Sequence, residues 1–249
     1  MRAITEFLYA LTNLLPPGLK DRAPLIHIRN RLRHWEILRR TSELVEKPYY
    51  REQIETRQFK VVFVSPIYKS FPLLAVSLID QTYDNWELLF VHDGPSDELP
   101  AIARSIIDSD SRIRMIETEK RANDWGHSPR QKGFEELSKN READFVVVTG
   151  SDNYHAPGYI EKMLEHFDEE ICVAYCDMVH EYYKWRNFET RLEYSFIDCG
   201  CVMARVETAL AAGLNDNSYE GDWRYVADLI DKCGTRAIRK VNATLYAHN

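Results

Sequence analysis

Several features that identify common protein classes are missing from this sequence. No stretch approaches the roughly 18 consecutive apolar residues that a membrane-spanning helix requires. The 249 residues carry 32 Lys and Arg against 39 Asp and Glu, and the net charge of −7 argues against a broad nucleic-acid interface. Neither G-x-G-x-x-G nor G-x-x-x-x-G-K-S/T follows a predicted strand, which disfavours dinucleotide cofactors and P-loop phosphate binding. The composition, with 45% hydrophobic residues, favours a soluble enzyme or binding domain of α/β type.

Cysteine is also scarce, and its spacing indicates no metal site. The five cysteines include no pair with the two-residue spacing of a zinc knuckle. The N-terminal stretch has no small-residue cleavage site, so it does not resemble a secretory signal. An odd number of cysteines without such a signal favours free thiols in a reducing compartment. We therefore expect a cytoplasmic protein.

The first 58 residues differ from the rest of the chain in charge. Residues 1–60 carry 12 Lys and Arg against 7 Asp and Glu, a net charge of +5, whereas the remaining 20 against 32 give −12. Apolar residues between Ile4 and Leu15 share one helical face, and Pro16 ends that helix. This pattern predicts a helical arm over residues 1–58 that attaches the protein to a membrane surface, peripherally, or to a twin subunit in a homodimer. Packing of the same apolar face on the body of the protein is the alternative.

From residue 59 onwards, short apolar runs alternate with helical patterns. Runs rich in β-branched or aromatic residues predict strands at 59–64, 86–91, 112–116, 145–149 and 171–176. Between the strands apolar residues recur at helical spacing, and Ser128 with Gln131 predicts a capping box at the start of one helix. This alternation predicts a Rossmann-like α/β fold with a mainly parallel sheet flanked by helices. Beyond Asp177 the pattern blurs into aromatic and charged sequence.

Polar residues follow the predicted strands at the edge where an open parallel sheet binds ligands. Four segments come directly after a strand or in the loop beyond it: 65–68, 92–94, 125–128 and 150–153. They bring an aromatic ring, two carboxylates and an imidazole to one edge, near the cationic Arg130. In the absence of a glycine cradle, a phosphorylated ligand needs arginine or a metal held by carboxylates. Asp152 stands where a ligand of a hard cation is expected.

Four motifs occur in a fixed order along this part of the chain. They are residues 62–97 (with S-P-I-Y and V-H-D-G-P-S-D), 126–133, 144–157 and 219–224 (Y-E-G-D-W-R). In this order and spacing they resemble the family 2 glycosyltransferases. Members of that family are inverting enzymes of the GT-A fold that use nucleotide-activated sugars. The resemblance implies a GT-A domain over residues 59–249, with a nucleotide-sugar-binding half at 59–165 and an acceptor half at 166–249.

The resemblance also implies which residues bind the nucleoside diphosphate sugar. The nucleobase would lie between Tyr68, which follows Pro66, and Asp93. Arg130 would face the diphosphate, because an arginine in the first turn of a helix opposes the helix dipole unless an anion is near. The last acid of the family's D-x-D motif falls on Asp152. This match implies a divalent metal, Mn²⁺ or Mg²⁺.

The last motif is expected to carry the catalytic base. Asp222 matches the acid of the family's E-D-W segment, and Glu220 is its rival for the role. A late histidine binds the metal in many GT-A enzymes, which implies the same for His248. The implied activity is that of a hexosyl- or deoxyhexosyltransferase of polysaccharide biosynthesis, with a glycan or lipid-linked acceptor. The candidate acceptor residues are Trp125, His127, Asp198, Glu220 and Trp223.

Three positions depart from the family pattern. Gly150 replaces the first acid of D-x-D, His92 replaces the first of two adjacent acids, and Gly221 precedes Asp222. Because fewer carboxylates weaken the binding of hard cations, a catalytically degenerate GT-A fold that acts as a binding or scaffold subunit stays open. A sugar nucleotidyltransferase is the other alternative, although residues 65–69 contain no glycine for its signature loop.

The predicted arm can be tested by truncation. If residues 1–58 serve only attachment, a chain that starts at Arg57 should keep its affinity for the nucleotide donor, measured by calorimetric titration. A truncated chain that is folded and monomeric but does not bind nucleotide would show instead that the arm belongs to the site.

Overall fold

The computed structural model describes residues 59–249, apart from 140–141, 215–217 and 219. The predicted helical arm of residues 1–58 lies outside the described residues, so its role stays a prediction. Among the described residues, no helix has both the length and the apolar character needed to cross a bilayer.

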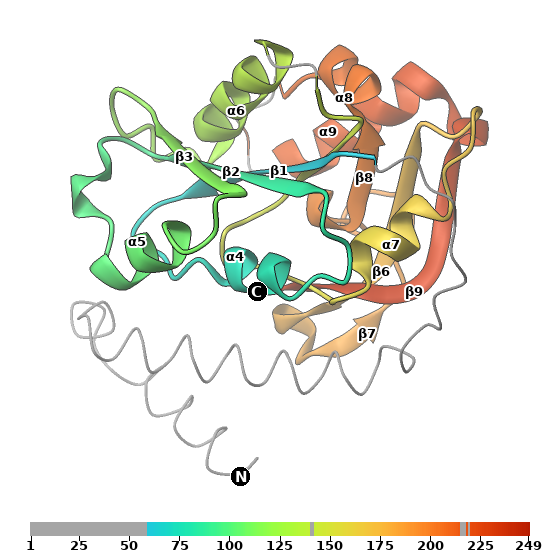
Figure 1. Ribbon diagram of the computed structural model, residues 1–249. Coiled ribbons are helices and arrows are strands. Elements are labelled where there is room, and N and C mark those ends of the chain that lie inside the picture. Colours follow the sequence, from blue (N-terminus) through green and yellow to red (C-terminus); the bar gives the residue numbers. More distant parts are fainter. Residues whose placement is uncertain (1–58, 140–141, 215–217, 219) are drawn as a thin grey trace, which may run out of the picture.

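One mixed sheet organises the described part of the chain (Figure 1). Its nine strands run in the order β3-β2-β1-β4-β8-β6-β9-β5, and β7 pairs with β6 at the side. β1 pairs in parallel with β2 and β4, and β2 pairs in parallel with β3. β8 is antiparallel to both β4 and β6, and thus joins the two halves of the sheet. The strands are β1 (Val61–Ile67), β2 (Trp86–His92), β3 (Ile113–Glu117), β4 (Phe145–Val148), β5 (Tyr154–His155), β6 (Val173–His180), β7 (Arg186–Phe188), β8 (Val202–Arg205) and β9 (Ile238–His248).

Helices cover both faces of this sheet. In Figure 1, α6, α8 and α9 lie on one side of the strands, and α4 and α5 lie on the other. The helices are α4 (Leu73–Ile79), α5 (Ala101–Ile107), α6 (His127–Lys139), α7 (Tyr159–Leu164), α8 (Val206–Ala212) and α9 (Gly221–Cys233). Short 3₁₀ turns are η1 (Ser96–Glu98), η2 (Glu181–Tyr183), η3 (Cys199–Cys201) and η4 (Thr235–Ala237).

The central parallel strands form the core because they are buried on both faces. Phe63, Phe90 and Phe145 are fully buried on three neighbouring strands. Strands covered on both sides are expected to be continuously apolar rather than alternating, as β1 and β4 are. Burial of each large apolar side chain contributes about 1.5–3 kcal/mol, so these strands form a firm base for the loops at their ends.

The predicted order of strands and helices is confirmed, with shifted ends. β1 continues to Ile67 through Pro66, which the sequence pattern placed after the strand. The β1–β4 pairing stops at Val64, so the missing N–H of Pro66 leaves no ladder bond unmade on that side. The antiparallel strands β7 and β8 lie in the segment beyond Asp177 where the sequence pattern blurs.

The predicted start of α6, with Ser128 as the N-cap, is wrong by two residues, and its cap is a different side chain. Ser128 is inside the helix, which begins at His127. The carboxylate of Asp124 accepts hydrogen bonds from the Ser128 backbone N–H at 3.0 Å and from its hydroxyl. An aspartate stabilises the exposed N–H groups of a first helical turn better than a serine hydroxyl, because its charge also complements the helix dipole.

The long strand β9 changes register beside β6. Val241 is opposite Cys176, Thr244 is opposite Asp177, and Tyr246 is opposite Met178. β9 therefore contains extra residues at two points, as in a β-bulge. Bulges of this kind bend a strand and change the direction of its second half. This second half carries His248 to the site described below.

The close contact between α6 and β1 generates a stability prediction. A Cβ atom built on Gly133 would come 2.4 Å from Cγ1 of Val64. Alanine gains about 1 kcal/mol over glycine in a helix, but overpacking of a core costs about 1–3 kcal/mol. We expect Gly133→Ala to lower the free energy of unfolding in urea, whereas Gln131→Ala, at an exposed position two residues earlier in the helix, should leave it nearly unchanged. A stabilised Gly133→Ala variant would contradict this packing.

Candidate active site

Several loops meet at one edge of the sheet. The parallel strands β1, β2 and β4 end there at Ile67, His92 and Val148. β8 runs the opposite way, so η3 at its start lies at the same edge. β5 pairs with the end of β9, where Tyr154 is opposite Ala247, and thereby brings His248 to this edge. The edge where ligands are expected thus collects residues from both halves of the chain.

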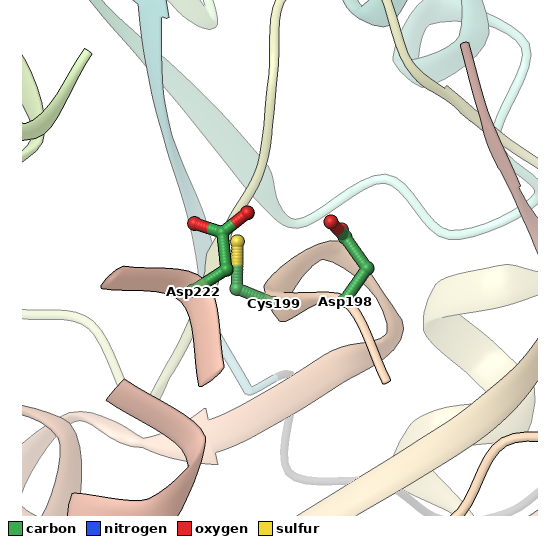
Figure 2. A group of neighbouring side chains, drawn as sticks. All are labelled: Asp198, Cys199 and Asp222. Atoms are coloured by element: carbon green, nitrogen blue, oxygen red, sulfur yellow. The ribbon is translucent and has the colours of Figure 1, made fainter. Parts of the chain in front are cut away.

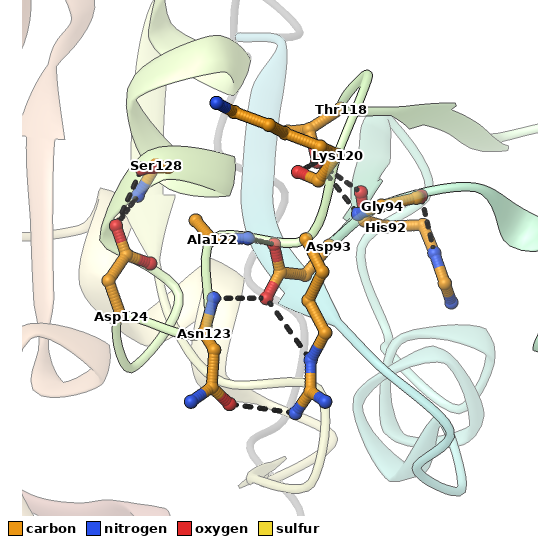
Figure 3. Close-up of polar contacts among 10 residues, drawn as sticks. His92, Asp93, Gly94, Thr118, Lys120, Ala122, Asn123, Asp124 and Ser128 are labelled. Atoms are coloured by element: carbon orange, nitrogen blue, oxygen red, sulfur yellow. Dashed lines mark hydrogen bonds and ion pairs between the residues drawn. The ribbon is translucent and has the colours of Figure 1, made fainter.

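Asp93 forms hydrogen bonds to the loop that follows β3. Its carboxylate accepts hydrogen bonds from the backbone N–H of Ala122 at 2.7 Å and of Asn123 at 3.0 Å (Figure 3). The Arg121 guanidinium lies 4.0 Å from the same carboxylate and 3.9 Å above the Tyr68 ring. Asp93 is 7% exposed and Tyr68 is half-buried. The two residues predicted to bind the nucleobase are therefore brought together, with Arg121 between them.

The next residues of this loop have unusual backbone conformations. Asn123 and Trp125 have φ angles of 55° and 56°; asparagine adopts this left-handed region readily, but a bulky residue such as tryptophan rarely does. Gly126 has a φ of 86°, and a Cβ there would come 2.6 Å from Cγ of Pro66. The loop therefore packs directly on β1, and it holds the 68% exposed Trp125 at the rim of the site. Residues in such conformations cost about 1–3 kcal/mol and cluster at functional sites.

The turn after β4 presents Asp152. Its neighbours in the turn are buried and bonded: the Ser151 and Ser70 hydroxyls are 2.8 Å apart. The Asn153 side chain accepts a hydrogen bond from the backbone N–H of Asn249 at 3.1 Å. Asp152 itself is exposed. The turn is thus tied to the end of β9, next to His248, with its carboxylate at the surface.

A buried ion pair joins α6 to α9. Nη1 of Arg130 lies 2.6 Å from Oδ1 of Asp222, and the Arg130 side chain is only 9% exposed. Burial acts to raise the pKa of Asp222, but the Arg130 guanidinium and a hydrogen bond from Cys199 outweigh it and hold that pKa below its usual value. Asp222 is in the first turn of α9, whose cap position is Glu220. The predicted base and the predicted diphosphate ligand are therefore direct partners here.

Asp198 continues this network towards the end of β9. Its carboxylate accepts hydrogen bonds from the Tyr246 hydroxyl at 2.7 Å and the Gly200 N–H at 2.8 Å. Nε2 of His248 lies 3.4 Å from its other oxygen. Burial, with the nearby charge of Asp222, raises the pKa of Asp198. The His248 ring stacks at 4.2 Å on His180, and burial followed by the charge of His248 lowers the pKa of His180 to about 4.

Three of these residues form a group of potential metal ligands. Within the described ranges, Asp198, Cys199 and Asp222 bring one ligand atom each to within 4.8 Å of the others (Figure 2). Burial raises the pKa of the Cys199 thiol well above its usual value, and Arg130 already neutralises Asp222. A cation here would have to displace a buried proton and compete with a guanidinium. The group is therefore better described as a hydrogen-bonded acidic network.

The chemistry of Asp152 and His248 fits a divalent ion better. Asp152 offers an exposed carboxylate, the oxygen ligand that Mg²⁺ and Mn²⁺ prefer. Nδ1 of His248 is buried and has no hydrogen-bond partner among the described residues, while Nε2 faces Asp198. A ring whose second nitrogen faces a carboxylate matches the usual arrangement of metal-binding histidines. Gly150, two residues before Asp152, offers no side-chain ligand.

The remaining acceptor candidates surround the start of α9. His127 is buried at the start of α6, and its charge acts on Asp222. Glu220 is exposed and accepts a hydrogen bond from the Tyr194 hydroxyl at 3.1 Å. The rings of Tyr194 and Trp223 are 6.5 Å apart and nearly perpendicular. Trp125 stands apart from this group, on the loop between β3 and α6.

Four residues of the site were missed from the sequence. Cys199 and Tyr246 belong to buried segments whose pattern indicates only core. Arg121 lies in a charged stretch where nothing distinguishes a ring-stacking arginine from a solvated one. Tyr194 lies in the blurred segment, where the turn that carries it has no glycine signal. Only the aromatic content of that segment hinted at a surface with a function.

Residues 64–213 match the family model described as "Glycosyl transferase family 2". EpsH of Bacillus subtilis (strain 168), a protein named as a glycosyltransferase, is 32% identical over 106 residues. That match covers 43% of this chain and 29% of EpsH. The chain therefore spans less than a third of this relative.

Solved structures share the fold at lower identity. S. aureus TarS aligns with a TM-score of 0.60 and 15% identity, over 77% of this chain and 37% of that one. A mannosyltransferase from Pyrobaculum calidifontis, in complex with GDP-Man and Mn²⁺, aligns with a TM-score of 0.55 and 16% identity, over 98% of this chain and 68% of that one. The predicted α/β fold of GT-A type is confirmed by these similarities.

The buried ion pair generates a prediction about stability. Asp222→Asn leaves Arg130 buried with no anionic partner, and breaking a fully buried pair costs about 3–5 kcal/mol. Because the Asp222 side chain is 35% exposed, we expect a smaller loss, about 1–3 kcal/mol, in urea unfolding at pH 7. The double variant Arg130→Met/Asp222→Asn should recover part of it, and Asp231→Asn, an exposed change on the same helix, should lose little.

The contribution of the Asp222 carboxylate to the free energy of unfolding should depend on pH. The folded pKa of Asp222 lies below the unfolded value of about 3.9, so its contribution is complete above that pH and is lost as the pH falls through the folded pKa. The stability difference between the native chain and Asp222→Asn should therefore shrink below about pH 4. An undiminished difference at pH 3 would rule out the carboxylate as its source.

Proposed function

Because the chain belongs to the family 2 glycosyltransferases, we propose that it transfers a sugar from a nucleoside diphosphate donor to a hydroxyl group of an acceptor, with inversion at the anomeric carbon. The observation that carries this proposal is the arrangement of one sheet edge. The pair of Tyr68 and Asp93, the exposed Asp152 and the carboxylate of Asp222 all lie at or beside the carboxyl ends of the parallel strands.

The donor would bind across β1, β2 and the loop after β3. The nucleobase would stack on the Tyr68 ring and be recognised near Asp93. The Arg121 guanidinium, which lies over the Tyr68 ring, would shift as the base binds or cover the outer face of the base. Arg130 supplies positive charge for the diphosphate and shares it with Asp222. Support comes from fold relatives, since TarS has been solved with UDP-GlcNAc and the archaeal mannosyltransferase with GDP-Man.

A divalent ion, Mn²⁺ or Mg²⁺, would be held by Asp152 and His248 together with the donor phosphates. When bound, such an ion offsets the negative charge that grows on the leaving diphosphate. Asp198 orients His248 through Nε2, so that Nδ1 remains for the ion. With glycine at position 150, we expect weaker metal binding than two carboxylates would give.

Asp222 would act as the general base. The acceptor oxygen forms a bond to the anomeric carbon as the bond from that carbon to the diphosphate oxygen breaks. The proton of the acceptor hydroxyl passes to the Asp222 carboxylate, and the nucleoside diphosphate leaves. Its low pKa makes Asp222 a weak base by itself. A donor diphosphate that draws on the charge of Arg130 would raise the pKa of Asp222 and so strengthen it.

The acceptor is a glycan or a lipid-linked hydroxyl compound, and the arm of residues 1–58 would hold the protein at the membrane surface or in a homodimer. A scaffold subunit of the same fold is the second candidate, because Gly150 removes a metal carboxylate and Arg130 neutralises the proposed base. The two candidates differ in turnover but share nucleotide binding.

A donor panel tests the proposed function and its metal. The full chain is titrated by calorimetry with UDP, GDP and dTDP in the presence of Mn²⁺, and slow hydrolysis of the matching nucleotide sugars is followed by release of the nucleoside diphosphate. We expect one base to bind, and hydrolysis to stop in excess chelator and in Asp152→Ala. Removal of residues 248–249 should raise the Mn²⁺ concentration for half-maximal nucleotide binding. Binding without hydrolysis of any donor would favour the scaffold, and no binding at all would refute both.

The base assignment has its own test. Asp222→Asn should lower kcat about 10²–10⁴-fold, because general base catalysis supplies that range, and it should not weaken donor binding, because Arg130 is released towards the diphosphate. The assay temperature must lie well below the melting temperature of the variant, given the unpaired Arg130. Glu220→Gln is the matched comparison, two residues away on the same helix start. If it loses activity while Asp222→Asn keeps it, the base is Glu220; if both turn over normally, this motif carries no base.

A further inference from the structure

Two aromatic rings at the start of α9 form an exposed corner. The Tyr194 and Trp223 ring centroids are 6.5 Å apart, and the ring planes meet at 72°. Tyr194 is 51% exposed, while Trp223 is partly buried against the core. Glu220 borders the corner and accepts a hydrogen bond from the Tyr194 hydroxyl at 3.1 Å. Tyrosine and tryptophan rings combine a large apolar face with a polar atom, so a partly exposed pair of them next to a carboxylate can offer a ligand both stacking and hydrogen bonding.

The turn that carries Tyr194 is closed by contacts between Arg191 and Phe196. The Arg191 N–H donates to the Phe196 carbonyl at 3.1 Å, and the Arg191 guanidinium lies 4.3 Å above the Phe196 ring. Phe196 stacks in turn on Phe188 of β7 at 5.8 Å. The hydroxyl end of Tyr194 is fixed by Glu220. Tyr194 is held by the turn at its backbone and by Glu220 at its hydroxyl. Ligand binding would therefore cost little conformational entropy of this side chain.

The corner lies beside the proposed base. Trp223 follows Asp222 in the first turn of α9, and Glu220 is the cap position of the same helix. We propose that Tyr194, Trp223 and Glu220 form the subsite that binds a neutral saccharide ring of the acceptor. This inference rests on the proposed function, since it concerns the substrate that Asp222 deprotonates.

The chemistry of the corner selects this class of ligand. The C–H face of a pyranose ring packs on an aromatic face, and sugar hydroxyls donate hydrogen bonds to carboxylates such as Glu220. A phosphorylated acceptor would bring its negative charge against Glu220 and Asp222. Among the described cations on these elements, Arg130 is paired with Asp222 and Arg191 lies against Phe196. Arg224, which follows Trp223 in α9, is exposed. The reacting hydroxyl itself would lie next to Asp222, whose carboxylate disfavours a phosphate at that point.

Saturation-transfer difference NMR tests the subsite directly. The full chain, with Mn²⁺ and the one of UDP, GDP and dTDP that binds to it, is mixed with neutral probes (cellobiose, lactose, maltose and methyl hexosides) and with phosphorylated ones (glucose 6-phosphate and 3-phosphoglycerate). We expect ring-proton signals from at least one neutral saccharide and weak or no signals from the phosphorylated probes. Tyr194→Ala should weaken saccharide binding about three- to tenfold, and Tyr194→Phe should retain most of it, since stacking needs only the ring. Ile102→Ala, a similarly exposed apolar position on α5, serves as the control.

The outcomes separate this inference from the proposed function. If a nucleoside diphosphate binds to the native chain but no neutral saccharide gives a signal, or if Tyr194→Ala binds the saccharide as well as the native chain, the subsite is wrong and the proposed function stands. If only the phosphorylated probes give signals, the acceptor class is wrong. If none of UDP, GDP and dTDP binds, the proposed function fails first. Retained folding of each variant is checked by its near-ultraviolet circular dichroism.

Discussion

The ion pair between Arg130 and Asp222 is the interaction on which the site depends. It is the point where α6, which follows the nucleotide-side strands, meets α9, which follows the antiparallel half of the sheet. A buried guanidinium without an anion is costly, so each helix start fixes the other. The same carboxylate is linked through Cys199 and Asp198 to Tyr246 and His248 at the end of β9. One charge pair thereby sets the spacing between the two halves of the active-site edge.

The fold and the identity of the site edge could be predicted because they depend on local patterns. Continuous apolar runs and helical spacing indicate buried parallel strands with helices between them. The carboxyl ends of such strands lie at one edge of the sheet, which is where ligands bind. Tyr68, Asp93 and Asp152 were predicted in this way to follow strand ends at one edge, and they lie after β1, β2 and β4 there. The cap of α6 was assigned to the wrong residue because serine and aspartate give the same signal, and only the path of the loop decides between them.

The partners of these residues could not be predicted, because they come from contacts between distant segments. Nothing in the sequence near Arg130 indicates Asp222, which follows 92 residues later. Asp93 matched a nucleobase position in the sequence motif. Its carboxylate also accepts hydrogen bonds from two backbone N–H groups of the loop after β3, and this contact is found only in the structure. Likewise His248 was expected near a metal, and the structure adds Asp198 and His180 as its neighbours.

The register change in β9 has a consequence for how this region can vary. Tyr246 and His248 share one face of the strand and both reach Asp198, whereas Ala247 points to the opposite face, with Leu73 and Tyr154. In a regular strand, loss or gain of a single residue would exchange these faces, so that a small side chain replaced the phenol and the imidazole. A bulge instead absorbs a change of length by changing its own shape, so the stretch 242–245 is where β9 can vary in length. The pairs beyond it, from Tyr246 to His248, leave no such freedom, because each of them is opposite a fixed residue of β6.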